Sequence, residues 1–291
     1  MNTLKVFITG GSGYIGRATI EVLRRQGHEV AALARSDESA RTVSELGATP
    51  VRGSLTDTDV LREAASQADG VIHLGQNQSE DTGDIDRAAA AAMQDGVGSG
   101  PYVHTGGAWI YGNTDGVVGE DAPFAPPQIT AWRIENEKRV LARAESGGHP
   151  VVVMPGIVYG RAGGVPQLLL VNQGRANGVV PCIGDGDNRW ALVHVEDLAE
   201  LYVLALGAPA GSVYAGAGGQ NVAFKDIANA ASSAAGCAGN VHHLTLDEAR
   251  GMLGLLADAL VLDQQFSGER ARRELGWRPT HQDALTVLAQ G

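Results

Sequence analysis

The stretch Thr9-Gly10-Gly11-Ser12-Gly13-Tyr14-Ile15-Gly16 decides how this chain is interpreted. Glycines 10, 13 and 16 follow the apolar run Leu4–Thr9 and open a helical pattern over Tyr14–Gln26. In this context the backbone turns sharply and brings an anionic group close to bare N–H groups at a helix start. The stretch therefore predicts a site for the pyrophosphate of a dinucleotide, held by Gly10, Ser12, Gly13, Tyr14, Ile15 and Gly16.

The end of the second expected strand, Glu29–Leu33, bears on which dinucleotide binds. NAD sites place a carboxylate there, which accepts hydrogen bonds from the ribose hydroxyls. This chain has Ala34-Arg35-Ser36 instead, and a guanidinium suits a 2′-phosphate. Arg35 and Ser36 are therefore expected to favour NADP(H), and Arg17 can add a second positive charge. Binding of NAD(H) stays open, because two acidic residues follow Ser36 and Arg35 is also compatible with a solvated loop.

Short apolar runs alternate with helical patterns, which indicates βαβ units and a parallel sheet. The expected fold class is α/β, a Rossmann-type doubly wound parallel sheet with a small C-terminal substrate lobe. The nucleotide-binding core is expected at 1–160, rejoined near 190–215, and the lobe at 161–189 and 216–291. Further strands are expected at Val71–Leu74, Tyr102–Thr105, Val151–Met154 and Trp190–Val195, and helices at Thr58–Gln67, Ile85–Asp95, Ile129–Ser146, Glu196–Leu206, Phe224–Ala235 and Thr245–Leu256.

The composition excludes several classes of protein. With 291 residues, 44% of them hydrophobic and 19% charged, the chain can bury a core and is not a disordered protein. A formal net charge of −11 argues against a nucleic-acid partner. No run approaches the roughly 20 apolar residues of a membrane span, and no signal-peptide pattern is expected at the N-terminus. Cys182 and Cys237 do not have the spacing of a metal site or of a disulfide framework, so no metal is expected. Two such cysteines are expected in a protein of the reducing cytoplasm.

Further segments follow the glycine loop in an order that resembles the extended short-chain dehydrogenase/reductase family. The loop matches the TGxxGxxG of that family. The other matching segments are Gly53–Asp57, Val71–Gly75, Ile110–Gly112, Pro155–Gly160, Val193–Ala199 and Glu274–Pro279. The resemblance implies that Ser54 and Leu55 lie by the adenine. It also implies that Leu74, Gly75 and Gln76 lie by the nicotinamide ribose, and Pro155, Gly156 and Val158 by the nicotinamide.

The chain departs from this family at the catalytic positions. The family uses a Ser or Thr, a Tyr, and a Lys four residues after the Tyr, and the Tyr passes a proton to the carbonyl oxygen. Alignment on Tyr111-Gly112 puts Gly107, Trp132 and Asn136 at those three positions. An indole is no general acid near neutral pH and an amide carries no charge. The usual proton relay is therefore excluded.

Three residues are candidates for an altered catalytic site. The hydroxyl of Thr105 can hold the carbonyl or the ribose, Trp132 can stack on an aromatic substrate or the nicotinamide, and Asn136 can bond a ribose hydroxyl. Thr105 can equally be a structural threonine, and Trp132 a core-facing aromatic on an amphipathic helix. Asp197 is expected to cap the helix that begins near it.

These features favour an NADPH-dependent ketoreductase that acts on a bulky, aromatic secondary metabolite, similar to the atypical ketoreductases of antibiotic pathways. Since the cofactor carries the hydride chemistry, a substrate hydroxyl beside the carbonyl would have to supply the proton. Two alternatives stay open: a regulator that senses NADP(H) without turnover, and a non-redox epimerase or lyase. The oligomeric state is open between monomer and homodimer.

Overall fold

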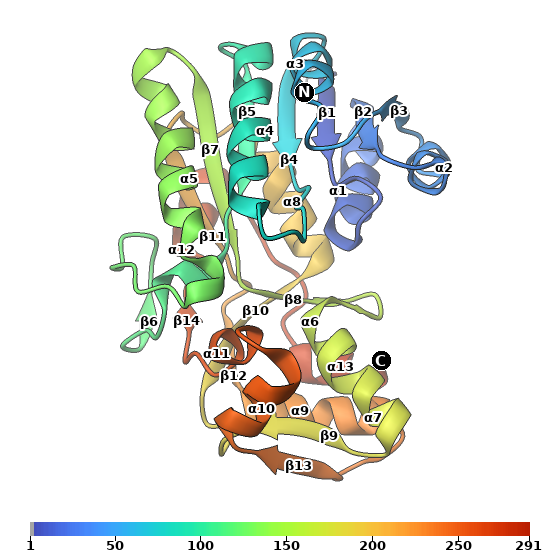
Figure 1. Cartoon of the computed structure of the whole chain (residues 1–291), viewed down its shortest axis with the longest axis vertical. Helices are drawn as coiled ribbons and strands as arrows, with labels where there is room; N and C mark the ends of the chain where they lie inside the picture. Colours follow the sequence, from blue (N-terminus) through green and yellow to red (C-terminus); the bar gives the residue numbers. More distant parts are fainter. Residues whose placement is uncertain (1–2) are drawn as a thin grey trace.

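Seven parallel strands form the main sheet of the computed structural model, which describes residues 3–291 (Figure 1). This sheet confirms the α/β, Rossmann-type doubly wound fold predicted from the sequence. In sheet order the strands are β11 (Ser212–Gly216), β7 (His149–Pro155), β5 (Pro101–Thr105), β4 (Gly70–His73), β1 (Lys5–Thr9), β2 (Glu29–Ala34) and β3 (Thr49–Arg52).

The strand order reverses between β1 and β4. From β1 the chain proceeds outward to β2 and β3, and from β4 it proceeds to the other edge through β5, β7 and β11. At such a switch point the loops that follow the two neighbouring strands diverge and leave the crevice in which doubly wound sheets bind ligands. The glycine loop follows β1 and the segment 74–76 follows β4. Both therefore lie at this crevice.

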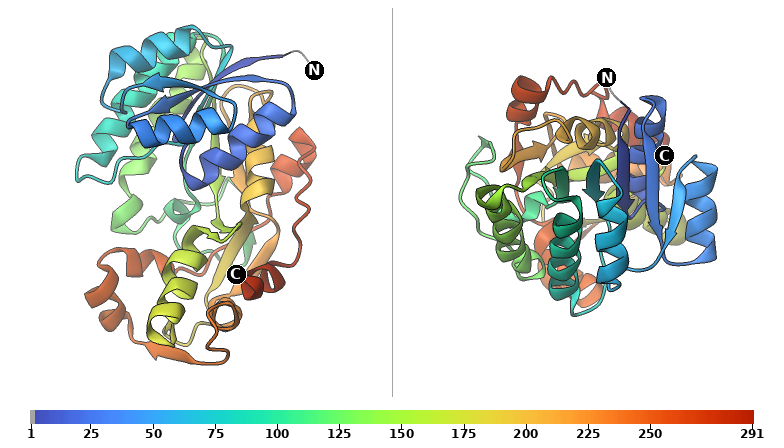
Figure 2. Two further views of the ribbon diagram at one scale, coloured as in Figure 1. Left: turned by 90° about the vertical axis from the view of Figure 1, so that its right-hand side faces the viewer. Right: turned by 90° about the horizontal axis from the view of Figure 1, so that it is seen from above.

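Helices cover both faces of the sheet (Figure 2). Two of them, α1 and α8, pack against each other over one buried apolar cluster, and α3 and α4 pack over the second. Within residues 3–291, no helix combines the length and apolar character that crossing a bilayer requires. The helices around the sheet are α1 (Tyr14–Arg25), α2 (Asp37–Glu45), α3 (Thr58–Ser66), α4 (Thr82–Val97), α5 (Trp132–Ala142), α8 (Val195–Ala205) and α12 (Glu269–Leu275).

Two expected helices are interrupted in the structure. The expected helix over 129–146 consists of a 3₁₀ turn, η2 (Gln128–Thr130), then α5, then a second 3₁₀ turn, η3 (Arg143–Ser146). The expected helix over 245–256 divides at Gly254, whose φ of 57° is left-handed. Because such a glycine ends a helix, two short helices result, α10 (Leu246–Leu253) and α11 (Leu256–Leu260).

A smaller lobe lies below the sheet in Figure 1. Strand β7 continues into β8 (Ile157–Gly160), so the carboxyl ends of the parallel strands face this lobe. Its core includes Trp190 stacked on Phe224, with ring centroids 4.4 Å apart. The residue limits of core and lobe stay a prediction. The lobe also contains β9 (Val180–Ile183), β10 (Arg189–His194), β12 (Gln220–Ala223), β13 (Val241–Leu244), α6 (Gly164–Pro166), η4 (Gln167–Val171), α7 (Asn172–Asn177), α9 (Phe224–Ala234) and α13 (Ala284–Gln290). The remaining short elements are η1 (Ala108–Tyr111), β6 (Val117–Val118) and β14 (Gln265–Phe266), of which β6 and β14 pair with each other.

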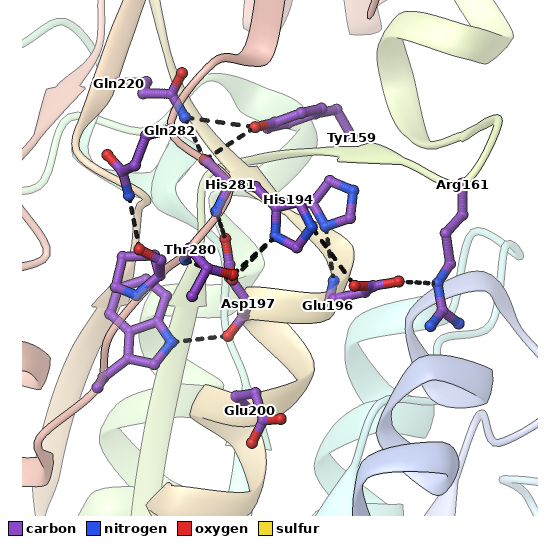
Figure 3. Close-up of polar contacts among 12 residues, drawn as sticks. Tyr159, Arg161, His194, Glu196, Asp197, Glu200, Gln220, Thr280, His281 and Gln282 are labelled. Atoms are coloured by element: carbon purple, nitrogen blue, oxygen red, sulfur yellow. Dashed lines mark hydrogen bonds and ion pairs between the residues drawn. The ribbon is translucent and has the colours of Figure 1, made fainter. Parts of the chain in front are cut away.

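A buried carboxylate on α8 joins the C-terminal segment to the core (Figure 3). Asp197 accepts hydrogen bonds from the backbone N–H groups of Thr280 (2.9 Å) and His281 (3.1 Å), and from the Thr280 hydroxyl (3.2 Å). The prediction that Asp197 caps its helix is wrong, because α8 begins at Val195 and the His194 ring accepts the N–H of Glu196 as the cap. The carboxylate is used for tertiary bonding instead.

Candidate active site

The glycine loop forms a cradle that side chains would fill. A Cβ on Gly10 would lie 2.7 Å from the carbonyl carbon of Leu74, and the φ of Gly10 is 71°. A Cβ on Gly16 would lie only 2.1 Å from the Gly10 carbonyl oxygen. Gly13 is exposed, and a Cβ added there would meet only the Gly10 carbonyl oxygen, at 3.2 Å. The loop is therefore closed beneath and open at Gly13, as the approach of a pyrophosphate requires.

The start of α1 is suited to an anion. Its first turn has no acidic residue, and no side chain caps it. The positive end of the helix dipole is thus available to a ligand. Tyr14, the first helical residue, donates its hydroxyl hydrogen to the Gly160 carbonyl oxygen (2.7 Å) and fixes the helix start against the turn after β8. Ser12 and Ile15 are half-buried beside it.

At the end of β2, the guanidinium of Arg35 is exposed and has no hydrogen-bond or ion-pair partner within residues 3–291. The nearest acid in sequence, Asp37, binds Arg52 instead, at 2.5 Å. Ser36 forms a reciprocal capping pair with Ser39 at the start of α2. The loop is thereby ordered while the positive charge of Arg35 stays free for a ligand.

The remaining predicted cofactor residues surround the same crevice. Gly75 donates its N–H to the Thr9 hydroxyl (3.1 Å), and a Cβ on Gly156 would lie 2.3 Å from the Ala191 carbonyl oxygen. Both close approaches fix loops at the carboxyl ends of strands. Ser54 forms a turn with Asp57 (2.7 Å from N–H to Oδ2). Leu55, Leu74, Pro155 and Val158 are half-buried or buried, and Gln76 is exposed.

The three candidate catalytic residues lie on β5 and α5. Thr105 donates its hydroxyl hydrogen to the His73 carbonyl oxygen (2.7 Å) and accepts one from the buried Tyr202 (2.9 Å). Asn136 is buried and donates to the Gly83 carbonyl oxygen (2.8 Å) and to Asp86 (3.0 Å). Trp132 is half-buried as the first residue of α5. These hydrogen bonds give Thr105 and Asn136 a structural role. The catalytic roles of all three residues stay predictions.

A buried cluster beneath this site contains two histidines and one carboxylate. Asp86 Oδ1 lies 3.3 Å from His73 Nε2, and Asp86 Oδ2 lies 3.8 Å from His104 Nε2. The other ring nitrogens contact hydroxyls, Thr9 for His73 (2.5 Å) and Tyr102 for His104 (3.1 Å). These hydroxyls are suited to donate to Nδ1, which puts each ring hydrogen on Nε2. Both N–H groups then lie beside Asp86 without a hydrogen bond among the described residues, an arrangement that favours an ionised carboxylate.

The electrostatics of this cluster follow from that arrangement. Burial alone would raise the pKa of Asp86, but the imidazoles and the Asn136 amide outweigh it and hold this pKa well below its usual range. Burial lowers the pKa of His104 to about 3, although Asp86 opposes the shift. A neutral imidazole and an ionised carboxylate therefore coexist beneath the end of β5.

Sequence reasoning missed two residues of α5, Arg133 and Glu137. The guanidinium of Arg133 donates to the Thr105 carbonyl oxygen (3.1 Å) and to Gln76 Oε1 (2.9 Å), so it connects the ends of β4 and β5. Glu137 is 3% exposed, and its Oε1 has no hydrogen-bond partner among the described residues. Opposite charges four residues apart are typical of an exposed helix pair, so no sequence signal distinguished these two.

Burial raises the pKa of Glu137 to about 8, although the charge of Arg133 opposes this shift and that of Asp86 adds to it. The side chain lies against Gly106, where a Cβ would be 2.7 Å from Glu137 Oε1. Tyr111 is a further titratable neighbour, and burial is the main cause of its raised pKa. At neutral pH the carboxyl of Glu137 is therefore mostly protonated.

Glu137→Gln is expected to abolish a decline of stability between about pH 4.5 and 8. The folded pKa of about 8 exceeds the ordinary value of 4.5, so the contribution of this group is complete below 4.5 and is lost as pH rises to 8. One pKa unit corresponds to about 1.4 kcal/mol, so a loss of a few kcal/mol is expected. Urea unfolding at pH 5, 7 and 9 measures it. Glu135→Gln, an exposed change on the same helix, is the control, and an equal decline between pH 5 and 9 in all three proteins would contradict the assignment.

The chain resembles known proteins over nearly all of its length. Residues 6–215 match the model of the NAD dependent epimerase/dehydratase family. An uncharacterized protein of Saccharomyces cerevisiae, YLL056C, is 35% identical over 292 residues that cover 95% of each chain. The 4-hydroxy-2-methyl-3-oxo-4-farnesyl-3,4-dihydroquinoline-1-oxide ketoreductase of Stigmatella aurantiaca is 27% identical and covers 99% of this chain and 96% of its own.

Among solved structures, the UDP-glucose 4-epimerase of Thermus thermophilus in complex with NAD superposes with a TM-score of 0.79. The identity is 21%, and 98% of this chain and 97% of that one are covered. At this identity the likeness shows the fold. The family match confirms the predicted resemblance to extended short-chain dehydrogenase/reductases and indicates NAD(P)-dependent oxidoreductase or epimerase activity. The chain belongs to the NAD-dependent epimerase/dehydratase family.

Proposed function

We propose that the protein is an NADPH-dependent reductase of a carbonyl group on a bulky, aromatic substrate. The observation that carries this proposal is the free guanidinium of Arg35 at the end of β2, beside an intact glycine cradle. A guanidinium there favours a 2′-phosphate over a bare ribose, and NADPH supplies a hydride when it is bound. The free thiols Cys182 and Cys237 support a reducing, cytoplasmic setting.

The chain's own residues would divide the work of holding the cofactor. The N–H groups after Gly13 would bind the pyrophosphate, Arg35 and the exposed Arg17 would bind the 2′-phosphate, and Gln76 would face the nicotinamide ribose. Positions 132 and 136 offer an indole and a buried amide in place of a phenol and a lysine. The proton is therefore proposed to come from a hydroxyl of the substrate beside its carbonyl.

The apolar surface of the smaller lobe supports an aromatic substrate. Leu168, Met252 and Leu255 are 61%, 66% and 46% exposed. Exposed apolar side chains in one lobe are typical of a binding surface. The similarity to a relative named as a quinoline-oxide ketoreductase agrees with this substrate class.

The direct test is NADPH oxidation by the purified protein with hydroxyquinones and aromatic polyketide ketones, with NADH in parallel. A product heavier by two hydrogens is expected, with NADPH as the better cofactor. A substrate whose neighbouring hydroxyl is methylated should react more slowly by about 10²- to 10⁴-fold, the usual contribution of general acid catalysis. Equal rates for the two substrates would exclude proton delivery by the substrate.

Two other functions give different results in the same assay. A regulator that senses NADP(H) would bind the cofactor tightly and oxidise none with any acceptor. An epimerase or lyase would convert its substrate without net consumption of cofactor. Either result would replace the proposed reductase.

A further inference from the structure

Arg133 offers an unneutralised positive charge at the carboxyl ends of β4 and β5. Its two described acceptors, the Thr105 carbonyl oxygen and the Gln76 amide oxygen, are both uncharged. Within residues 3–291 no carboxylate oxygen lies within 4 Å of it, whereas Arg139 on the same helix is paired with Glu135 at 3.0 Å. A guanidinium has five N–H donors, and two of them are used here.

The surroundings of Arg133 leave room for a ligand and hold the side chain still. A Cβ on Gly107 would meet nothing closer than Arg133 Nε, at 3.9 Å. Gly107 stands where the family has its catalytic hydroxyl, so the space of that side chain is open beside the guanidinium. The indole of Trp132 stacks on the guanidinium, 4.6 Å from the ring centroid. Restrained donors of this kind can stabilise charge that develops on a substrate.

Glu137 does not neutralise the positive charge of Arg133. It lies one turn further along α5, yet its carboxyl is buried against Gly106 and forms no ion pair with Arg133 within the described residues. A protonated carboxyl there is neutral and leaves the guanidinium its full charge. A paired, ionised carboxylate would compete with an anionic ligand.

We propose that Arg133 binds the reacting oxygen of the substrate and is the catalytic residue that replaces the missing Tyr and Lys. This inference rests on the proposed carbonyl reduction. As the carbonyl carbon accepts a hydride from NADPH, the π electron pair of the C=O bond moves onto oxygen, and the resulting alkoxide pairs with the guanidinium. Arg133 keeps its own protons, since a guanidinium is not an acid near neutral pH. The proton that completes the alcohol comes from the substrate hydroxyl or from water.

A binding measurement tests this role without turnover. 3-Hydroxy-2-naphthoate carries an anionic oxygen on an aromatic frame, and 3-hydroxy-2-naphthamide is its neutral counterpart. Calorimetric titration of each into the protein saturated with NADP⁺ gives their Kd values. R133Q is expected to weaken naphthoate binding by at least about 30-fold, the value of a charge-assisted hydrogen bond. Binding of the amide and of NADP⁺ should change little.

Two further variants and one rate measurement make the test specific. R133K keeps the charge but not the planar fork, so partial naphthoate binding is expected. R139Q removes an exposed arginine from the same helix and should leave naphthoate binding unchanged. Reduction of a ketone substrate should fall by about 10²- to 10³-fold in kcat for R133Q, the usual cost of losing one oxyanion donor.

The outcomes separate this inference from the proposed function. Equal naphthoate affinity of the wild type and R133Q, including undetectable affinity in both, overturns the role of Arg133. A charge-dependent loss that R133K partly restores supports it. If no ketone is reduced by the wild type, the proposed function fails by that separate measurement, whatever the carboxylate titration gives.

Discussion

Gly16→Ala is expected to lower the affinity for NADPH by about 100-fold or more, the loss that a misplacement of about 1 Å can cause. The added Cβ would lie 2.1 Å from the Gly10 carbonyl oxygen, a distance that requires the backbone of the cradle to shift. The backbone fixes the position of the new Cβ, and the Gly10 carbonyl oxygen belongs to the backbone, so no side-chain rotation relieves the contact. The turn and the start of α1 must separate, and the pyrophosphate site then loses its shape.

Quenching of protein fluorescence by NADPH measures this affinity, and urea unfolding shows whether the fold survives. Gly251→Ala is the matched control, since Gly251 is an exposed helical glycine whose Cβ position is open. That variant should keep its NADPH affinity and gain about 0.5–1 kcal/mol of stability from helix propensity. Wild-type affinity in Gly16→Ala would show that the cradle does not hold the cofactor.

Arg35→Glu is expected to reverse the cofactor preference. Each charge-assisted hydrogen bond to the 2′-phosphate is worth about 1.5–3 kcal/mol, so kcat/KM with NADPH should fall by roughly 100-fold. The new carboxylate would also repel the phosphate and accept hydrogen bonds from the ribose hydroxyls of NADH. The ratio of kcat/KM for the two cofactors, compared between wild type and variant, is the quantity to measure.

The control for this charge reversal is Arg62→Glu, which makes the same change of charge on α3. Arg62 forms an exposed ion pair with Asp59, and such pairs contribute little to stability. Its cofactor ratio should equal that of the wild type. An unchanged ratio of kcat/KM in Arg35→Glu would show that Arg35 does not bind the 2′-phosphate, and Arg17 would then be the next residue to test.

The parts of the site that depend on local chemistry could be predicted from the sequence. The glycine spacing placed the cradle, because the strand before it and the helix after it are contiguous in the chain. Arg35 could be proposed for the site because it directly follows β2. The interruption of the expected helix at Gly254 was missed because a glycine within a helical pattern can also be tolerated there.

The parts that depend on tertiary packing could not be predicted. Arg133 and Glu137 have the spacing of a surface ion pair. The fold instead buries Glu137 against Gly106 and directs Arg133 to the Thr105 carbonyl oxygen. The sheet of the smaller lobe pairs β10 with β8 and β12, which come from separate parts of the chain. No local pattern encodes either arrangement.

The bonding of Asp197 has a consequence for how the chain is assembled during synthesis. Its carboxylate is buried, and the groups that contact it belong to residues 280 and 281. A ribosome synthesises these partners 83 and 84 residues after Asp197 itself. Until then the nascent chain would carry a buried charge without partners, which is strongly unfavourable. The final packing of α8 therefore waits for residues 277–281, since the Trp277 indole also donates to the backbone carbonyl oxygen of Asp197.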